Sequence, residues 1–65
     1  MITESIGANG HTYRLSTNVK AIGPDTIRIE YVVHTVMPDG SLEWGHYFND
    51  LDSATRYWIR KLREA

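Results

Sequence analysis

Residues 26–48 read TIRIEYVVHTVMPDGSLEWGHYF, and this stretch decides the fold. Its first half, residues 26–37, is rich in β-branched and aromatic side chains, which favour a strand. Residues 38–41, Pro-Asp-Gly-Ser, then predict a hairpin turn, because an Asp-Gly pair suits a tight turn with positive φ. Residues 42–48 are therefore expected to return as a second strand that pairs with the first.

The hairpin also assigns the two faces of the sheet. If Asp39 and Gly40 form the centre of a two-residue turn, four pairs face each other: Met37 and Leu42, Thr35 and Trp44, Val33 and His46, and Tyr31 and Phe48. Because side chains alternate with a period of two, one face collects the apolar groups and is predicted to be the core face: Ile27, Ile29, Tyr31, Val33, Met37, Leu42, Trp44 and Phe48. The opposite face is predicted to stay uncovered: Arg28, Glu30, Val32, His34, Val36, Glu43, Gly45 and Tyr47.

The remaining segments complete a single domain over residues 1–65. Residues 1–10 predict a flexible arm or a short edge strand. Alternation of polar and apolar side chains predicts a strand over residues 11–19. Residues 23–25, Gly-Pro-Asp, then predict the turn into the next strand.

A helix is expected to follow, from an N-cap at Asn49 or Asp50 to about Arg63. One stripe at helical spacing would pack on the sheet, with Tyr57 or Ile59 at its border: Leu51, Ala54, Trp58 and Leu62. The predicted fold is therefore α+β, a three-stranded antiparallel sheet with one C-terminal helix packed on one face, in the order β-β-β-α.

Size and composition narrow the function classes. A chain of 65 residues buries only about 60% of its unfolded surface, so a large internal active-site cavity is not expected. The absence of cysteine argues against a disulfide framework or a thiolate metal site and fits a reducing cytoplasm, which is the host cytoplasm if the protein is phage-encoded. No apolar run approaches the roughly 20 residues that cross a bilayer, so no membrane partner is expected.

Charge is strongly polarised along the chain. Residues 29–55 contain five carboxylates and neither Lys nor Arg, whereas four of the seven basic residues lie in the last ten positions. The net charge of −1 hides this asymmetry, which bears on partners and encounter rather than on the fold. Three of the five carboxylates are explained by a turn and a helix start, while Glu30 and Glu43 have no such local role.

No motif predicts catalysis. The serines lack a strained turn or a paired base, and no glycine-rich phosphate loop is present. His34 and His46 would offer a metal at most two ligands from one side, whereas a structural zinc takes four, so ordinary strand histidines are favoured over a metal site. We therefore expect no enzyme activity and no metal or cofactor. A small metal hydrolase is the least favoured hypothesis.

A protein-binding surface is the preferred interpretation. On the uncovered face an apolar strip, with Tyr47 as an aromatic anchor, is ringed by negative charge, although scattered apolar groups are also normal on a solvated face. The expected contact residues combine this face with the acidic turn and the helix start: Glu30, His34, Asp39, Glu43, Tyr47, Asp50 and Asp52. The expected partner is a basic, nucleic-acid-binding protein, and the chain is expected to be a monomer or a weak homodimer.

An aromatic residue, a helix cap and an inner helix stripe follow one another in the last third of the chain: Phe48, Asp50, Ala54, Arg56 and Trp58. In this order, and in its order of elements, the chain resembles the ethylene-response-factor type of DNA-binding domain, which is similar to the arm-binding domains of phage integrases. The resemblance implies a three-stranded sheet packed on one helix. It also implies DNA contacts from arginines on the open sheet face, which here would be Arg14 and Arg28.

Two function hypotheses follow. In the preferred one the chain is a small non-enzymatic protein-binding module or inhibitor. Its acidic hairpin and helix start would occupy a basic, nucleic-acid-binding surface of a partner, and by type it is similar to phage-encoded inhibitors such as anti-CRISPR proteins and other DNA mimics. In the alternative it is a nucleic-acid-binding accessory domain that uses Arg14, Lys20, Arg28 and the basic end of the helix. The acidic stretch favours the first, because phosphate contacts depend on Lys and Arg.

Overall fold

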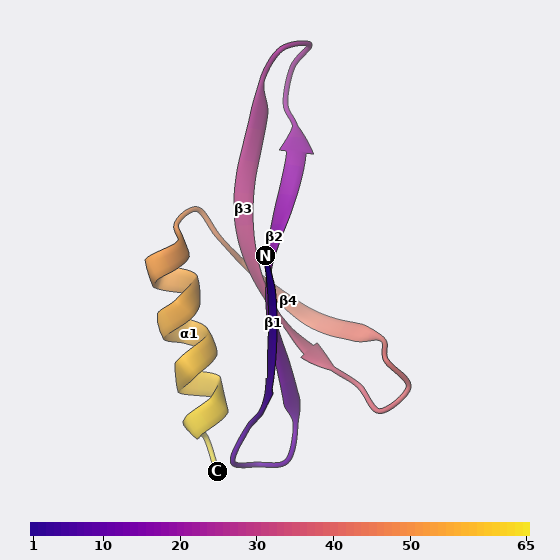
Figure 1. Cartoon of the computed structure of the whole chain (residues 1–65), viewed down its shortest axis with the longest axis vertical. Helices are drawn as coiled ribbons and strands as arrows, with labels where there is room; N and C mark the ends of the chain where they lie inside the picture. Colours follow the sequence, from indigo (N-terminus) through magenta and orange to yellow (C-terminus); the bar gives the residue numbers. More distant parts are fainter.

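An antiparallel sheet with one helix on one face forms the structure, a computed structural model that describes residues 1–65 (Figure 1). The elements are the strands β1 (Ile2–Ile6), β2 (Thr12–Ala21), β3 (Ile27–Val36) and β4 (Leu42–Phe48), followed by the helix α1 (Leu51–Arg63). The strands lie side by side in chain order, so each pairs with its neighbour in the sequence. The α+β class, the antiparallel sheet and the C-terminal helix are confirmed.

The sheet has four strands, so the prediction of three was wrong. The additional strand, β1, lies at the edge beside β2, from the pair Ile2 and Ser16 to the pair Ile6 and Thr12. All five of its side chains are exposed. Backbone pairing rather than burial therefore holds this strand. It lies within residues 1–10, where a short edge strand was one of the two alternatives predicted.

The β3–β4 hairpin departs from the predicted register near its turn. Two predicted pairs occur and two are replaced: Tyr31 faces Phe48 and Val33 faces His46, whereas Thr35 faces Glu43 and Val36 faces Leu42. The cause is a turn of three residues, 38–40, where two were predicted. It is closed by hydrogen bonds from Met37 N to Ser41 O and from Gly40 N to Met37 O, both 2.8 Å long. Gly40 has φ of 89°, the left-handed conformation that ends such a loop.

A β-bulge at Trp44 and Gly45 brings the rest of β4 back to the predicted register, because these two residues together oppose one residue of β3. Trp44 has φ of 51°, a left-handed conformation that costs an L-residue roughly 1–2 kcal/mol. Three predicted positions are corrected as a result. Leu42 lies on the uncovered face, Glu43 lies on the helix side, and Trp44 is 70% exposed rather than in the core.

The core lies between α1 and the helix-facing side of β2 and β3. Its centre is formed by Leu15, Val33 and Ala54, which are buried. Four partly buried aromatic residues pack around them: Tyr31, Phe48, Tyr57 and Trp58. The indole Nε1–H of Trp58 also donates to the Tyr13 carbonyl oxygen at 3.0 Å, which ties the helix directly to the backbone of β2.

Both ends of α1 are anchored. Asp50 is the N-cap, and its carboxylate accepts a hydrogen bond from the Ser53 backbone N–H at 2.8 Å. At the other end the β1–β2 turn contacts the helix, because the Ala8 N–H donates to the Leu62 carbonyl oxygen at 2.8 Å. Leu51, predicted for the inner stripe, is exposed instead.

The β2–β3 hairpin projects past the helix (Figure 1). The radius of gyration is 12.8 Å, whereas a compact domain of this length has about 11 Å. Ile27 and Ile29 lie on the predicted core face but are 63% and 47% exposed, because α1 does not extend over this part of the sheet. The predicted core face is therefore covered along only part of its length.

Candidate functional site

The face of the sheet turned away from α1, called here the uncovered face, consists of rows of side chains that run across the strands. The strand pairings define three neighbouring rows, each read from β1 towards β4: Ile2, Ser16, Val32 and Tyr47; then Glu4, Arg14 and His34; then Ile6, Thr12, Val36 and Leu42. Two largely apolar rows thus flank one polar row.

The apolar rows present large side chains to solvent. Ile2 and Ile6 are 67% and 72% exposed, and Leu42 and Tyr47 are 39% and 57% exposed. Val32, between them, is buried by its neighbours. Ile2 and Ile6 lie on β1 at one edge of the sheet, and Leu42 and Tyr47 lie on β4 at the other edge. Exposed apolar groups that share one face, with an aromatic residue among them, are typical of a surface that binds another protein.

The polar row is organised around Arg14 and His34. The Arg14 guanidinium forms an ion pair with the Glu4 carboxylate, so its charge is already balanced. Burial, and secondarily the Arg14 charge, lowers the pKa of His34 below its usual value, which keeps the imidazole neutral near neutral pH. The Nδ1 atom of His34 is buried without a hydrogen-bond partner, and its ring meets the Tyr47 ring edge-on, with centroids 6.3 Å apart.

Gly45 makes room for the His34 ring. A Cβ atom at residue 45 would lie 2.8 Å from His34 Nε2 and 3.3 Å from a ring carbon of Tyr47. The bulge therefore places the smallest residue where the two aromatic rings of the uncovered face come closest to the backbone of β4.

The predicted contact residues separate into two groups. Glu30, His34 and Tyr47 share the uncovered face, where Glu30 and Tyr47 line one shallow groove, and Asp39 lies in the β3–β4 turn. The other three lie elsewhere: Glu43 on the helix side of β4, and Asp50 and Asp52 at the start of α1.

Local contacts engage several of these carboxylates. Asp39 accepts hydrogen bonds from the Ser41 hydroxyl at 2.7 Å and the Ser41 N–H at 2.9 Å, which lower the pKa of Asp39. The Ser53 N–H likewise lowers the pKa of Asp50. Asp52 forms an ion pair with Arg56 at 3.1 Å. Glu30 and Glu43 form no ion pair, which leaves their charge available to a partner.

Sequence reasoning missed three apolar residues of the uncovered face: Ile2, Ile6 and Leu42. The alternation of Ile2, Glu4 and Ile6 was a usable signal for the first two, because a period of two places all three on one side of a strand. Leu42 could not have been placed there without knowing the length of the turn.

The basic residues also lie on separate elements of the structure. Lys20 lies directly opposite Arg28 on the projecting β2–β3 hairpin, and neither has an acidic partner within ion-pair distance. On α1, Lys61 pairs with Glu64 at 2.9 Å, and the Arg60 guanidinium lies 5.1 Å from the centre of the Tyr57 ring.

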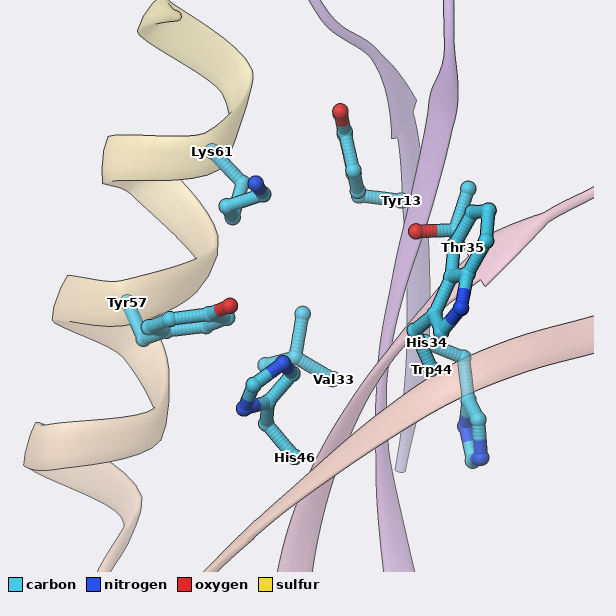
Figure 2. A pocket seen from close by; sticks show the side chains of 8 residues that line it. All are labelled: Tyr13, Val33, His34, Thr35, Trp44, His46, Tyr57 and Lys61. Carbon is cyan, nitrogen blue, oxygen red and sulfur yellow. The ribbon is translucent and has the colours of Figure 1, made fainter.

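A pocket of about 190 Å³ lies on the helix side of the sheet. Figure 2 shows Tyr57 and Lys61 pointing into it from α1, opposite Tyr13 and the residues of β3 and β4. The rings of His46 and Tyr57 pack together with centroids 4.8 Å apart. Trp44, displaced by the bulge, forms part of the far wall.

Comparison with known proteins gives no family assignment. No cluster of three or more histidine, cysteine or acidic side chains suited to a metal ion is present, and α1 is too short and too polar to span a membrane. No protein-family model matches the chain, and no curated protein and no solved structure matches it. The resemblance to the ethylene-response-factor type of domain therefore stays a prediction.

Proposed function

We propose that this protein is a small non-enzymatic protein-binding module. It docks through the uncovered face, and the acidic β3–β4 hairpin faces a basic, nucleic-acid-binding surface of the partner. One observation carries the proposal: Ile2, Ile6, Leu42 and Tyr47 are exposed together on a sheet face that no element of the chain covers. Burying them against a partner would supply the apolar contact area that a stable interface needs.

Tyr47 is the expected anchor of this interface. Its side chain is more than half exposed. Tyr47 belongs to one of the two apolar rows and also lines the groove that contains Glu30. Tyrosine is enriched among the few residues that dominate binding energy, because it combines a large apolar area with a polar tip and little conformational freedom.

The charge of the hairpin selects the partner. Asp39 and Glu43 lie on a hairpin arm that contains no Lys or Arg, since residues 29–55 lack both. Such a surface attracts a positively charged partner and accelerates encounter at low salt. Asp50 caps α1 and Asp52 is ion-paired, so the helix start contributes to the long-range field more than to direct contacts.

The test is a pull-down from nuclease-treated lysate of the host, and of the elements that invade that host, at low and high salt. The proposal expects a stoichiometric basic protein to be retained at low salt and released at high salt. Tyr47→Ala should weaken its binding at least about 30-fold, as for an interface residue worth about 2 kcal/mol. The double variant Asp39→Lys with Glu43→Lys should slow association.

A matched control uses the opposite end of the molecule. Asp25→Lys reverses an exposed charge in the β2–β3 turn, outside the proposed interface, and should leave binding nearly unchanged. If Tyr47→Ala and the hairpin double variant bind the captured partner as tightly as the unmodified protein does, the proposed surface is wrong.

One observation supports a second candidate function, nucleic-acid binding. Lys20 and Arg28 face each other on a projecting two-stranded ribbon, and like charges directly opposite each other destabilise a sheet unless an anion lies between them. A two-stranded ribbon also fits the major groove of DNA. Arg14, the third residue of this hypothesis, is engaged by Glu4.

A gel shift at low salt separates the two functions. Retention of duplex or single-stranded DNA by the unmodified protein, lost in Lys20→Gln with Arg28→Gln but kept in Arg56→Gln, would support nucleic-acid binding. No retention at micromolar protein would remove it.

A further inference from the structure

The pocket on the helix side provides a second site, on the face opposite the proposed protein-binding surface. It opens between the C-terminal half of α1 and the strands β3 and β4 (Figure 2). Its volume of about 190 Å³ is below the roughly 300–1,000 Å³ typical of sites for drug-sized molecules. A single ring with one polar group fits such a space, whereas a nucleotide does not.

The pocket contains one cationic side chain. Lys61 lines it, and no carboxylate is among the residues that line it. The ammonium group donates one hydrogen bond to Glu64 Oε1 at 2.9 Å, which leaves two of its three donors free. The same hydrogen bond raises the pKa of Lys61, so the side chain stays protonated at neutral pH.

The pocket also contains hydroxyl groups that can donate hydrogen bonds. The Tyr13 hydroxyl oxygen accepts a hydrogen bond from Asn9 Nδ2 at 2.9 Å, so its own hydrogen is free to donate elsewhere. Thr35 and Tyr57 add further hydroxyls to the lining. Together with Lys61 they favour a ligand that accepts several hydrogen bonds at one end.

The rest of the wall is aromatic. The packed rings of His46 and Tyr57 lie on one side, and the exposed indole of Trp44 lies on the other (Figure 2). The bulge is what brings Trp44 here, at the cost of a left-handed backbone conformation. A planar ring stacked on the indole would bury apolar area that is now exposed.

We propose that this pocket binds a small planar aromatic monocarboxylate, with the carboxylate at Lys61 and the Tyr13 hydroxyl and the ring against Trp44. The anionic end matches the donors of Lys61 and Tyr13 that have no partner within the protein, and the ring matches the aromatic wall. The pocket shares one lining residue, His34, with the uncovered face.

The test is an NMR titration of the ¹⁵N-labelled protein with benzoate, with benzamide as the neutral analogue and acetate as the anion without a ring. Benzoate should cause saturable shifts at Thr35, Lys61 and the Trp44 indole. Lys61→Met, which keeps the apolar stem, should weaken benzoate binding at least about tenfold, as expected from losing a charge-assisted hydrogen bond. Lys20→Met, the same change outside the pocket, should leave it unaltered.

A second variant covers the case in which Lys61→Met does not fold. Trp44→Gly removes the aromatic wall at a position where glycine suits the backbone, so it should fold and still lose benzoate binding. Tighter binding of benzoate than of benzamide or acetate, lost in these pocket variants, supports the proposal. Absence of saturable shifts, equal binding of the three probes, or unaltered benzoate binding in the folded pocket variants overturns it.

Discussion

Replacing Gly45 with alanine tests how firmly the bulge fixes His34. The added Cβ would lie 2.8 Å from His34 Nε2 and 3.1 Å from His34 Cδ2, where carbon atoms in contact are normally about 3.5–4.0 Å apart. Gly45 is not among the glycines with positive φ, so only the steric clash opposes alanine. Overpacking of this kind costs about 1–3 kcal/mol, and each kcal/mol lowers the melting temperature of a domain this small by about 4–8 °C.

The measurement is urea unfolding of four proteins: the unmodified chain, Gly45→Ala, His34→Ala and the double variant. Once the imidazole is removed, the two shortest contacts of the alanine methyl group are gone, and the remaining 3.3 Å contact needs only a small shift of the Tyr47 ring. The substitution also restricts the unfolded chain. Gly45→Ala should then stabilise the protein by about 0.4–1 kcal/mol. The effect of the same substitution is therefore expected to change sign between the two backgrounds.

The refuting result is equally specific. If Gly45→Ala costs the same in both backgrounds, within about 0.5 kcal/mol, the His34 ring is not what excludes a side chain at residue 45. The packing of the uncovered face around His34 would then be incorrect.

Three further predictions concern the turn, the helix cap and the helix anchor. Gly40→Ala should destabilise the protein by roughly 1–2 kcal/mol in urea unfolding, because φ at residue 40 is 89°; an unchanged midpoint would contradict the three-residue turn. Asp50→Asn keeps the capping oxygen but removes the charge. The Ser53 N–H lowers the pKa of Asp50 below its usual value of 3.8. The stability that this charge contributes is therefore complete above the pKa of the unfolded state and is lost as pH falls through the pKa of the folded state. Below about pH 4, the stability of the variant should therefore fall less steeply with pH than that of the unmodified protein, as measured by acid unfolding followed by circular dichroism. Trp58→Phe removes the donor to the Tyr13 carbonyl and should cost about 0.5–1.5 kcal/mol in thermal unfolding; a cost near zero would show that water replaces the bond.

The helix and the central strands could be predicted because their signals are local or strongly periodic. Asp50 offers a side-chain oxygen just before a helical stripe, and the structure places the cap there. The alternation around Val33 and the pairing of Tyr31 with Phe48 likewise survive in the structure. At the helix cap and in the central strands, the types and spacing of the side chains are enough to predict the local structure.

The register of the hairpin could not be predicted, because it depends on one residue of turn length. Asp39 and Gly40 suit both a two-residue turn and the end of a three-residue turn that begins at Pro38. The choice moves Leu42 and Glu43 to opposite faces. The bulge at Trp44 then restores the predicted register, so the residues further along the strand do not indicate the length of the turn. The bulge itself could not be predicted either, because a tryptophan rarely takes positive φ.

The candidate site was predicted only in part for a related reason. His34, Tyr47 and Glu30 lie on the strand face that the alternation assigned to them. The acidic stretch, in contrast, is continuous in sequence but not in space, because a hairpin and a helix start send consecutive carboxylates to different sides of the sheet. Which carboxylates share one surface can therefore be predicted only when the strand register is known.

The order of the strands has a consequence for how the chain folds. Every strand pairs with its neighbour in the sequence, so almost all of the sheet forms by closing short hairpins, the arrangement of low contact order that folds fast. The docking of the helix is the long closure, since hydrogen bonds join Trp58 to Tyr13 and Ala8 to Leu62, residues 45 and 54 positions apart. Because the entropy of closing a loop grows only with the logarithm of its length, adding a few residues to the turn at 22–26 would slow that step very little, and the chain can lengthen its projecting hairpin without losing the helix that completes its core.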